Sequence, residues 1–340
     1  MSEARHPGEV LYASEARRRA APVCDHYCGS PRQMEKALAL QSERGPLFDV
    51  TLDLEDGAPA GREREQLELV LELLRSDRNA HDRVGVRIHG LHTPWWRQEL
   101  ATLVCEAGAR LAHLTLPKAE GAAEVAEVVA QLERTAAACG LERPVPLRVL
   151  IETHGALREA DAIARLPGMA GLDFGLMDFI SAHDGAIPLA ALRSPLQFEH
   201  PLVVRAKAEI ATAAIAHGLV AAHNVTVDLD RPEQAGADAA RARIELGFLR
   251  MWSIHPSQIE PILAAFAPAP DELAEAGAVL MAAADAGWGP VRHAGRLHDA
   301  GSYRYHWQVL LRARQTGRRL PDEVAARFFS DAAGETGATR

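Results

Sequence analysis

The sequence predicts an α/β fold, a (β/α)8 TIM barrel followed by a C-terminal helical extension. Eight short, apolar, β-rich runs recur along the chain, and amphipathic segments separate them. Strands that alternate with helices form parallel βαβ units, and eight such units fit a closed barrel better than an open sheet. The chain also continues well beyond the eighth unit, so it contains more residues than the barrel needs.

Each predicted strand is a short apolar run. The eight runs are Ala21–His26, Phe48–Leu54, Arg83–Ile88, Ala112–Leu116, Leu147–Glu152, Gly171–Gly175, Leu219–His223 and Phe248–Ile254. The segments between them carry apolar residues at helical spacing. They include Arg62–Arg75, Trp96–Ala107, Ala122–Cys139, Leu157–Arg165, Val203–His217 and Glu233–Leu246.

The chain after the eighth strand is predicted to be mainly helical. The predicted elements are an eighth helix at Pro256–Phe266, a helix at Asp271–Ala286, a loop at Gly287–Ala300 and a last helix at Tyr303–Thr316. A closed barrel does not need these elements, so we expect them to cover a barrel mouth or to pack on a neighbouring subunit. The predicted organisation is an N-terminal segment (1–20), the barrel (21–266), the C-terminal helical extension (267–333) and a disordered tail (334–340).

Composition and charge narrow the functional class. With 48% hydrophobic and 24% charged residues, the chain is of ordinary globular type. Its net charge of -9 argues against nucleic acid or an anionic membrane as the main partner. No apolar run approaches the ~20 residues of a membrane span, and the polar start of the chain does not resemble a secretory signal. We therefore expect a cytoplasmic protein that acts on a small-molecule substrate.

The four cysteines, Cys24, Cys28, Cys105 and Cys139, are scattered along the chain. This is compatible with a reducing compartment. Cys24, His26 and Cys28 could suggest a zinc site, but no second pair of Cys or His with ligand spacing follows them. The zinc interpretation is therefore not favoured.

Two acidic residues at predicted strand ends indicate a metal site. Glu152 ends the fifth strand and Asp178 follows the sixth, and the reactive groups of such barrels lie at the C-terminal ends of the strands. Convergent carboxylates repel each other unless a cation or a shared proton lies between them. Hard oxygen ligands that leave room for water and substrate suit Mg²⁺. The sequence therefore predicts a divalent metal held by Glu152 and Asp178.

Other charged residues lie at the ends of neighbouring strands: Asp53, Glu55 and Asp56 at the second, Arg87 at the third and Lys118 at the fourth. The acids could orient metal-bound water, and Arg87 could hold a carboxylate or stabilise an enolate oxygen. The alternative is that these acids cap helices or form ion pairs with Arg87 and Lys118. Three strand-end histidines, His154, His223 and His255, could carry protons or have hydrogen-bonded structural roles.

At these residues the chain resembles the citrate lyase β-subunit-like branch of the HpcH/HpaI aldolase superfamily. The matching segments, which follow one another in order, are Leu52–Asp56, the strand of Arg87, Leu116–Lys118, Ile151–Thr153, Phe174–Asp178, Ser253–Ile259 and Gly295–Asp299. The resemblance implies a (β/α)8 barrel that assembles as a homotrimer or a hexamer.

The resemblance also implies roles for single residues. Glu152 and Asp178 would bind Mg²⁺, Arg87 would contact the substrate carbonyl, and Asp299 would act as an acid–base group in a neighbouring subunit's active site. A further set falls within the matching motifs and would bind substrate or support the site: Asp53, Glu55, Asp56, Lys118, Gly175 and His255.

The implied reaction is Mg²⁺-dependent cleavage of a malyl-, citramalyl- or citryl-CoA-like thioester into an acyl-CoA and a 2-oxo acid. Two departures leave the substrate open. The first strand reads Cys24–Gly29 where acyl-CoA-cleaving relatives carry a Val-Pro-Gly-type turn, and the third ends Arg87-Ile88-His89 instead of Arg-Val-Asn. The alternatives are an aldolase that acts on a free 2-oxo acid without CoA, and a non-catalytic binding subunit of the same fold.

Overall fold

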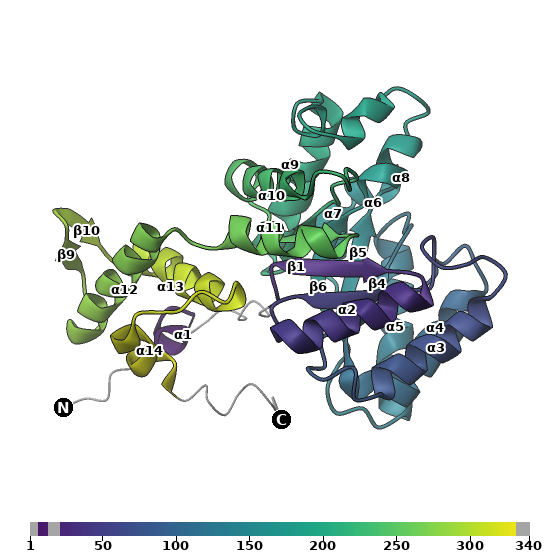
Figure 1. Ribbon diagram of the computed structural model, residues 1–340, viewed down its shortest axis with the longest axis horizontal. Coiled ribbons are helices and arrows are strands. Elements are labelled where there is room, and N and C mark those ends of the chain that lie inside the picture. Colours follow the sequence, from purple (N-terminus) through teal and green to yellow (C-terminus); the bar gives the residue numbers. More distant parts are fainter. Residues whose placement is uncertain (1–5, 13–20, 331–340) are drawn as a thin grey trace. The chain divides into compact units, whose positions relative to one another are not determined.

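The computed structural model describes residues 6–12 and 21–330, and its first eight strands form a closed parallel barrel (Figure 1). The strands follow chain order, and β8 pairs back with β1 through His26 and Ser253. They are β1 Cys24–Cys28, β2 Asp49–Asp53, β3 Val84–Arg87, β4 Leu111–Leu116, β5 Leu147–Ile151, β6 Met169–Phe174, β7 Val220–His223 and β8 Arg250–Ser253. The predicted TIM-barrel fold is confirmed.

Helices connect successive strands. They are α2 Pro31–Arg44, α3 Glu63–Arg75, α4 Trp95–Ala107, α5 Ala122–Ala138, α6 His154–Arg158, α7 Ala160–Ala164, α8 Leu176–Ser181, α9 Pro201–Ala216, α10 Pro232–Leu246 and α11 Pro256–Phe266. Short 3-10 turns lie at Gly108–Arg110, Leu189–Leu192 and Leu196–Phe198. The predicted helix Leu157–Arg165 is instead two short helices, because Thr153 caps an earlier start and the chain breaks at Glu159.

Helix α2 was not among the predicted helices, although local signals for it exist. Ser30 and Gln33 form a reciprocal capping box, and Pro31 occupies the first helical position, where its missing N–H costs nothing. The buried residues of the helix are few and include a polar one: Met34, Ala37, Leu38 and Gln41. This thin apolar stripe gives a weak periodic signal, and the caps are the better evidence for the helix.

Buried ion pairs join strands of the barrel. The fully buried Arg250 contacts Asp25 at 2.7 Å and Asp49 at 2.6 Å, and Arg148 pairs with Asp173 through Nε at 3.0 Å. Charges can be buried in this way only when they are paired.

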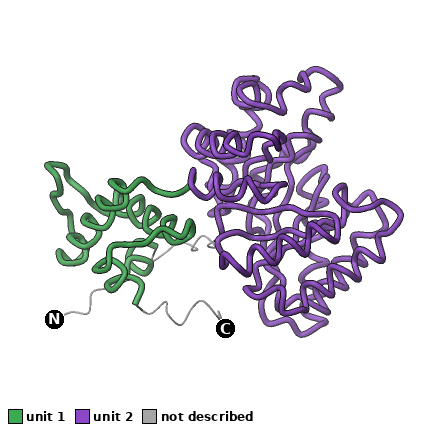
Figure 2. Tube along the Cα trace, viewed as in Figure 1, with its two compact units in different colours: residues 1–17, 266–340 green, residues 18–265 purple. Residues whose placement is uncertain are grey.

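The chain divides into two compact units, 18–265 with the barrel and 1–17 together with 266–340 (Figure 2). The second unit contains α1 Pro7–Val10, α12 Pro270–Asp285, α13 Ala300–Gln315 and α14 Asp322–Phe328. It has its own apolar core, in which Leu280, Tyr303 and Leu310 are fully buried. The tail 334–340, for which we expect disorder, lies outside the described residues, as does most of the N-terminal segment 1–20.

The prediction of a loop over Gly287–Ala300 is wrong for the central residues of this range. They form an antiparallel hairpin of β9 Val291–His293 and β10 Arg296–His298. Ala294 and Gly295 make the connection with positive φ angles of 45° and 79°, as in the two-residue turns that favour hairpins. An alanine at such a position gives little sequence signal for a turn.

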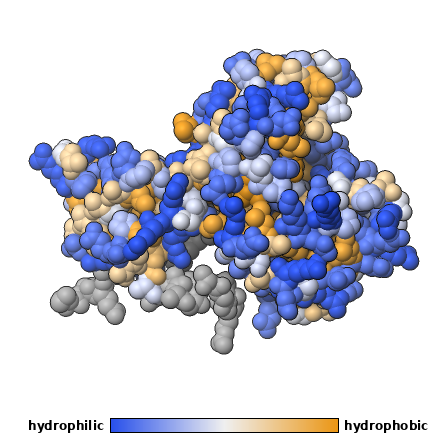
Figure 3. All heavy atoms as spheres, viewed as in Figure 1, coloured by the Kyte–Doolittle hydropathy of each residue, from blue (hydrophilic) through white to orange (hydrophobic). Residues whose placement is uncertain are grey.

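One face of the molecule is mainly hydrophilic. On the face drawn in Figure 3, hydrophilic residues predominate and hydrophobic residues lie scattered between them. None of the helices within residues 6–12 and 21–330 is long and apolar enough to cross a membrane.

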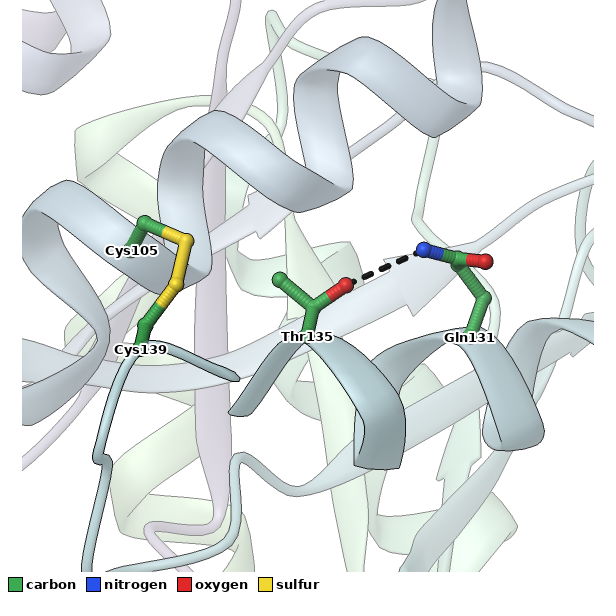
Figure 4. The surroundings of a disulfide bond; sticks show 4 residues. All are labelled: Cys105, Gln131, Thr135 and Cys139. Atoms are coloured by element: carbon green, nitrogen blue, oxygen red, sulfur yellow. Dashed lines mark hydrogen bonds between the residues drawn. A yellow bond between two sulfur atoms is a disulfide. The ribbon is translucent and has the colours of Figure 1, made fainter. Parts of the chain in front are cut away.

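A disulfide links two outer helices of the barrel (Figure 4). Cys105 on α4 bonds to Cys139, the residue that ends α5, with their Cα atoms 5.3 Å apart. Both residues are exposed, whereas Cys24 and Cys28 are buried thiols. The sequence offered no sign of this pair, because the two cysteines are separated by 34 residues and meet only when α4 packs beside α5.

Reduction of the Cys105–Cys139 disulfide should lower the free energy of unfolding by about 3–4 kcal/mol, because the bond closes a long loop in the unfolded chain. Denaturant unfolding with and without a reductant measures the change. The Cys105→Ser variant should show the lower stability in both conditions. If the reductant lowers the stability of Cys105→Ser as much as that of the wild type, the assignment of the disulfide is contradicted.

Candidate active site

Glu152 and Asp178 lie at the C-terminal ends of neighbouring strands. Glu152 follows β5 and is 2% exposed, while Asp178 lies in the first turn of α8, directly after β6. Strands β5 and β6 pair up to Ile151 and Phe174, so both acids come to the same end of the barrel. Gly175 makes the approach possible, because a Cβ atom there would lie 2.1 Å from Oε2 of Glu152.

The surroundings of Glu152, including the nearby Asp178, disfavour its ionised form. Burial first, and then the negative charge of Asp178, raises the pKa of Glu152 to about 8. One hydrogen bond opposes this shift, since the backbone N–H of Lys118 donates to Oε1 of Glu152 at 2.7 Å. Within the part of the chain that the structure describes, no hydrogen bond reaches Oε2 of Glu152 or the side chain of Asp178.

The chemistry of this donor set fits a divalent cation. Two close carboxylates with free oxygens repel each other, and a cation between them would offset the repulsion. Among residues 6–12 and 21–330, no group of three or more His, Cys, Asp or Glu side chains could hold a metal ion. Mg²⁺ commonly takes one or two protein carboxylates and completes its shell with water and substrate. Glu152 and Asp178 therefore suit Mg²⁺ better than a metal that needs an all-protein cage.

The acids after β2 form ion pairs, as in the alternative left open by the sequence. Asp53 binds the Arg87 guanidinium bidentately, with Nε at 2.8 Å, and it also accepts the backbone N–H groups of Glu55 and Gly57. Glu55 contacts Nη1 of Arg87 at 3.2 Å. Burial alone would lower the pKa of Arg87, but these acids raise it well above its ordinary value. The contacts leave some guanidinium N–H groups for a substrate.

Lys118 connects the two groups of acids. Its ammonium binds Glu55 and lies 2.6 Å from Asp56, while its backbone N–H holds Glu152. Its φ of +52° is in the left-handed region, which costs a non-glycine residue about 1–2 kcal/mol. Strain of this kind persists where the surroundings impose it, and it clusters at functional sites.

An aromatic pair that the sequence did not suggest lies beside Arg87. Tyr27 of β1 stacks on Trp252 of β8 at 3.9 Å between ring centroids, and the Arg87 guanidinium lies 5.7 Å from the Tyr27 ring. Next to them, His26 bonds to Ser253 at 2.6 Å, which gives this histidine a partner and a structural role. Successive side chains of a strand point to opposite faces, so the pattern along β1 and β8 could have indicated which residues share a face. Using that pattern requires the exact bounds of the strands, which only the structure supplies.

Two sequence-predicted site residues are not part of this contact network. His255 is exposed and bonds to Ser257 at 2.7 Å, a contact within its own turn. Asp299 belongs to the other compact unit, where it caps α13 by accepting the backbone N–H of Gly301 at 3.0 Å. Their roles in the site stay predictions.

Replacement of Lys118 should reveal its strained backbone. Lys118→Gly and Lys118→Ala both remove the ammonium, but only glycine adopts a positive φ freely. We expect the glycine variant to be the more stable by about 1 kcal/mol, the reverse of the usual order in a helix. Denaturant unfolding of both variants measures this, with Arg134→Gly and Arg134→Ala in α5 as controls that keep the usual order. A more stable Lys118→Ala would contradict it.

Comparison with known proteins places the chain among lyases. It is 30% identical over 266 residues to the L-malyl-CoA/beta-methylmalyl-CoA lyase of Cereibacter sphaeroides, covering 74% of this chain and 83% of the relative. A crystallised citrate lyase from Burkholderia xenovorans superposes with a TM-score of 0.82 at 50% identity, covering 96% of this chain and 99% of that one. The CitE protein of Mycobacterium tuberculosis, crystallised with magnesium, acetoacetate and coenzyme A, has a TM-score of 0.65 at 25% identity, covering 88% and 100%.

The profile of one protein family matches the barrel directly. It is that of HpcH/HpaI aldolase/citrate lyase, and the match covers residues 44–256, more than half of the chain. This range includes Glu152, Asp178, Arg87 and Lys118. The chain therefore belongs to the HpcH/HpaI aldolase/citrate lyase family and is a carbon–carbon lyase.

Proposed function

We propose that this lyase depends on Mg²⁺ and cleaves a malyl-, citramalyl- or citryl-CoA-like thioester into an acyl-CoA and a 2-oxo acid. The observation that carries the proposal is the pair of Glu152 and Asp178 at the barrel mouth, with free carboxylate oxygens and a raised Glu152 pKa. The magnesium, acetoacetate and coenzyme A in the crystal of the Mycobacterium tuberculosis relative support both the metal and the thioester.

Glu152 and Asp178 are the residues that would hold the metal. Bound Mg²⁺ would supply Lewis acidity to the carboxylate and hydroxyl oxygens of the substrate. Lys118 would keep Glu152 in place through its N–H, since that hydrogen bond occupies Oε1 and leaves Oε2 free. Gly175 would preserve the space that Glu152 needs.

Cleavage requires one bond to break and two protons to move. The substrate hydroxyl loses its proton as its carbon becomes the carbonyl of the 2-oxo acid. The carbon–carbon bond breaks, its electron pair forms the enolate of the thioester, and the enolate carbon then takes a proton. The N–H groups of Arg87 that Asp53 and Glu55 do not use would stabilise the negative oxygen.

We assign the transfer of the proton at the enolate carbon to Asp299, as an acid–base group. This assignment comes from the family resemblance, together with the proposal that a neighbouring subunit of a homotrimer or hexamer supplies the residue. Asp299 is exposed at the start of α13, so its carboxylate is accessible to a neighbour.

A second candidate is a CoA-independent aldolase that acts on a free 2-oxo acid. The observation that favours it is the sequence Cys24–Gly29, which stands where acyl-CoA-cleaving relatives carry a Val-Pro-Gly-type turn; here these residues include β1, and Tyr27 stacks on Trp252. The Tyr27 ring lies 5.7 Å from the Arg87 guanidinium, so the change at β1 borders the candidate site and leaves Glu152 and Asp178 in place.

Purified protein with Mg²⁺ should release a 2-oxo acid and an acyl-CoA from at least one of the malyl-, citramalyl- and citryl-CoA thioesters. Coupled detection of the 2-oxo acid, with chromatography of the CoA products, measures this. Turnover confined to 4-hydroxy-2-oxo acids would establish the second candidate instead. Inertness toward both substrate groups, without metal binding, would establish a non-catalytic binding protein.

Glu152→Gln and Asp178→Asn should each weaken Mg²⁺ binding by roughly a hundredfold or more, because even changes outside a metal's direct ligands cost about 10–100-fold. Isothermal titration calorimetry measures the affinity, and circular dichroism checks the fold. Asp184→Asn is the matched control, because this exposed acid follows the same helix α8. Wild-type affinity in either ligand variant would refute the assignment of that residue.

A further inference from the structure

Three histidine rings form a row in the C-terminal unit. His298 of β10 lies 5.3 Å from His306 of α13 and 6.4 Å from His293 of β9, measured between ring centroids. None of the three is among the predicted site residues. The row joins both strands of the hairpin to the helix that follows it.

The rings of His298 and His306 are buried, and each has a nitrogen that lacks a hydrogen-bond partner among the described residues. His298 is 6% exposed and His306 is 7% exposed. Nε2 of His298 and Nδ1 of His306 have no hydrogen-bond partner among residues 6–12 and 21–330, although buried polar atoms normally have one. An added proton on the His306 ring would therefore place a charge in a covered position, beside a nitrogen that lacks a hydrogen-bond partner among these residues.

The same contacts hold Asp299. This residue directly follows His298 and caps α13, where the hydroxyl of Ser302 accepts the backbone N–H of Asp299 at 3.2 Å. The fully buried Tyr303 donates to the backbone carbonyls of Gly289 and His298, at 2.7 and 3.1 Å. The position of the Asp299 carboxylate thus depends on how the hairpin packs against α13.

The charged groups around His306 do not offset the effect of burial on its pKa. Burial first, and then the neighbouring His298, lowers the pKa of His306 below its ordinary 6.5. Helix α12 contributes Glu275, which opposes the shift, but Glu275 is also paired with Arg296 of β10 at 2.9 Å. His293 and Arg296 lower the pKa further, and on α13 itself Tyr305 lies against the ring at 5.6 Å.

We propose that the adjoining rings of His298 and His306 position Asp299, holding the β9–β10 hairpin on α13 while His306 is neutral and releasing it when His306 gains a proton. His298 and His306 are positioning residues, since they act through Asp299. The catalytic meaning of the release depends on the role proposed above for Asp299, but the release itself does not.

The direction of the pH effect follows from linkage. A base whose pKa is lower in the folded protein favours the unprotonated form there, so its contribution to stability is complete above about pH 6.5. The contribution is lost as the pH falls below that value and through the pKa of folded His306. The hairpin should therefore be well ordered at neutral pH and loosened under mild acid.

Hydrogen–deuterium exchange of the full-length protein, read on peptides that cover residues 289–303, tests this. After correction for intrinsic exchange, protection should fall roughly tenfold or more between about pH 8 and pH 5. The variant His306→Phe keeps an aromatic ring but cannot be protonated, so its protection should not change with pH. The control His92→Phe replaces an exposed histidine of the barrel unit and should behave like the wild type.

Equal protection of the wild-type hairpin at both pH values would overturn the proposal, and so would a persisting pH response in His306→Phe. If His306→Phe does not fold, His306→Leu replaces it with the same expectation. The readout is independent of catalysis. Full lyase activity in Asp299→Asn would refute the catalytic role of Asp299 and leave the exchange result standing, so the two proposals can fail separately.

Discussion

The hydrogen bond from the backbone N–H of Lys118 to Glu152 joins the two halves of the charged barrel mouth. On one side of Lys118 lie Glu152 and Asp178, which repel each other. On the other side its ammonium holds Glu55 and Asp56, and Glu55 leads on to Arg87 and Asp53. One residue with a left-handed backbone thus orders charges that come from four strand ends. It can do so because the closed parallel barrel brings all these ends to one face.

The five acidic residues of the barrel mouth fall into two groups. Asp53, Glu55 and Asp56 have cationic partners, which balance their charge inside the protein. Glu152 and Asp178 lack such partners among the described residues, and burial together with their mutual repulsion raises the pKa of Glu152. A pair that is costly to ionise without a counter-charge gains most from a bound cation, which is why we propose the metal site at this pair. The paired acids instead hold Arg87 at a fixed place beside it.

Periodicity and strand-end chemistry could be read from the sequence because both are local. Eight apolar runs gave the barrel, and the residues that follow them gave Glu152, Asp178, Arg87 and Lys118. Features that depend on contacts across the barrel could not be read in this way. The ionic filling around Arg250, the Cys105–Cys139 disulfide and the stack of Tyr27 on Trp252 all join distant segments. The β9–β10 hairpin was missed for a different reason, since its turn uses an alanine with positive φ.

The central claim is that Glu152 and Asp178 hold the divalent metal, and a crystal soaked with Mn²⁺ and pyruvate tests it most directly. Mn²⁺ shares the oxygen-ligand preference of Mg²⁺ and is visible by anomalous scattering. The account predicts a single anomalous peak within about 2.0–2.4 Å of one oxygen from each carboxylate. A peak on Asp53, Glu55 or Asp56, or no peak between Glu152 and Asp178, would contradict it.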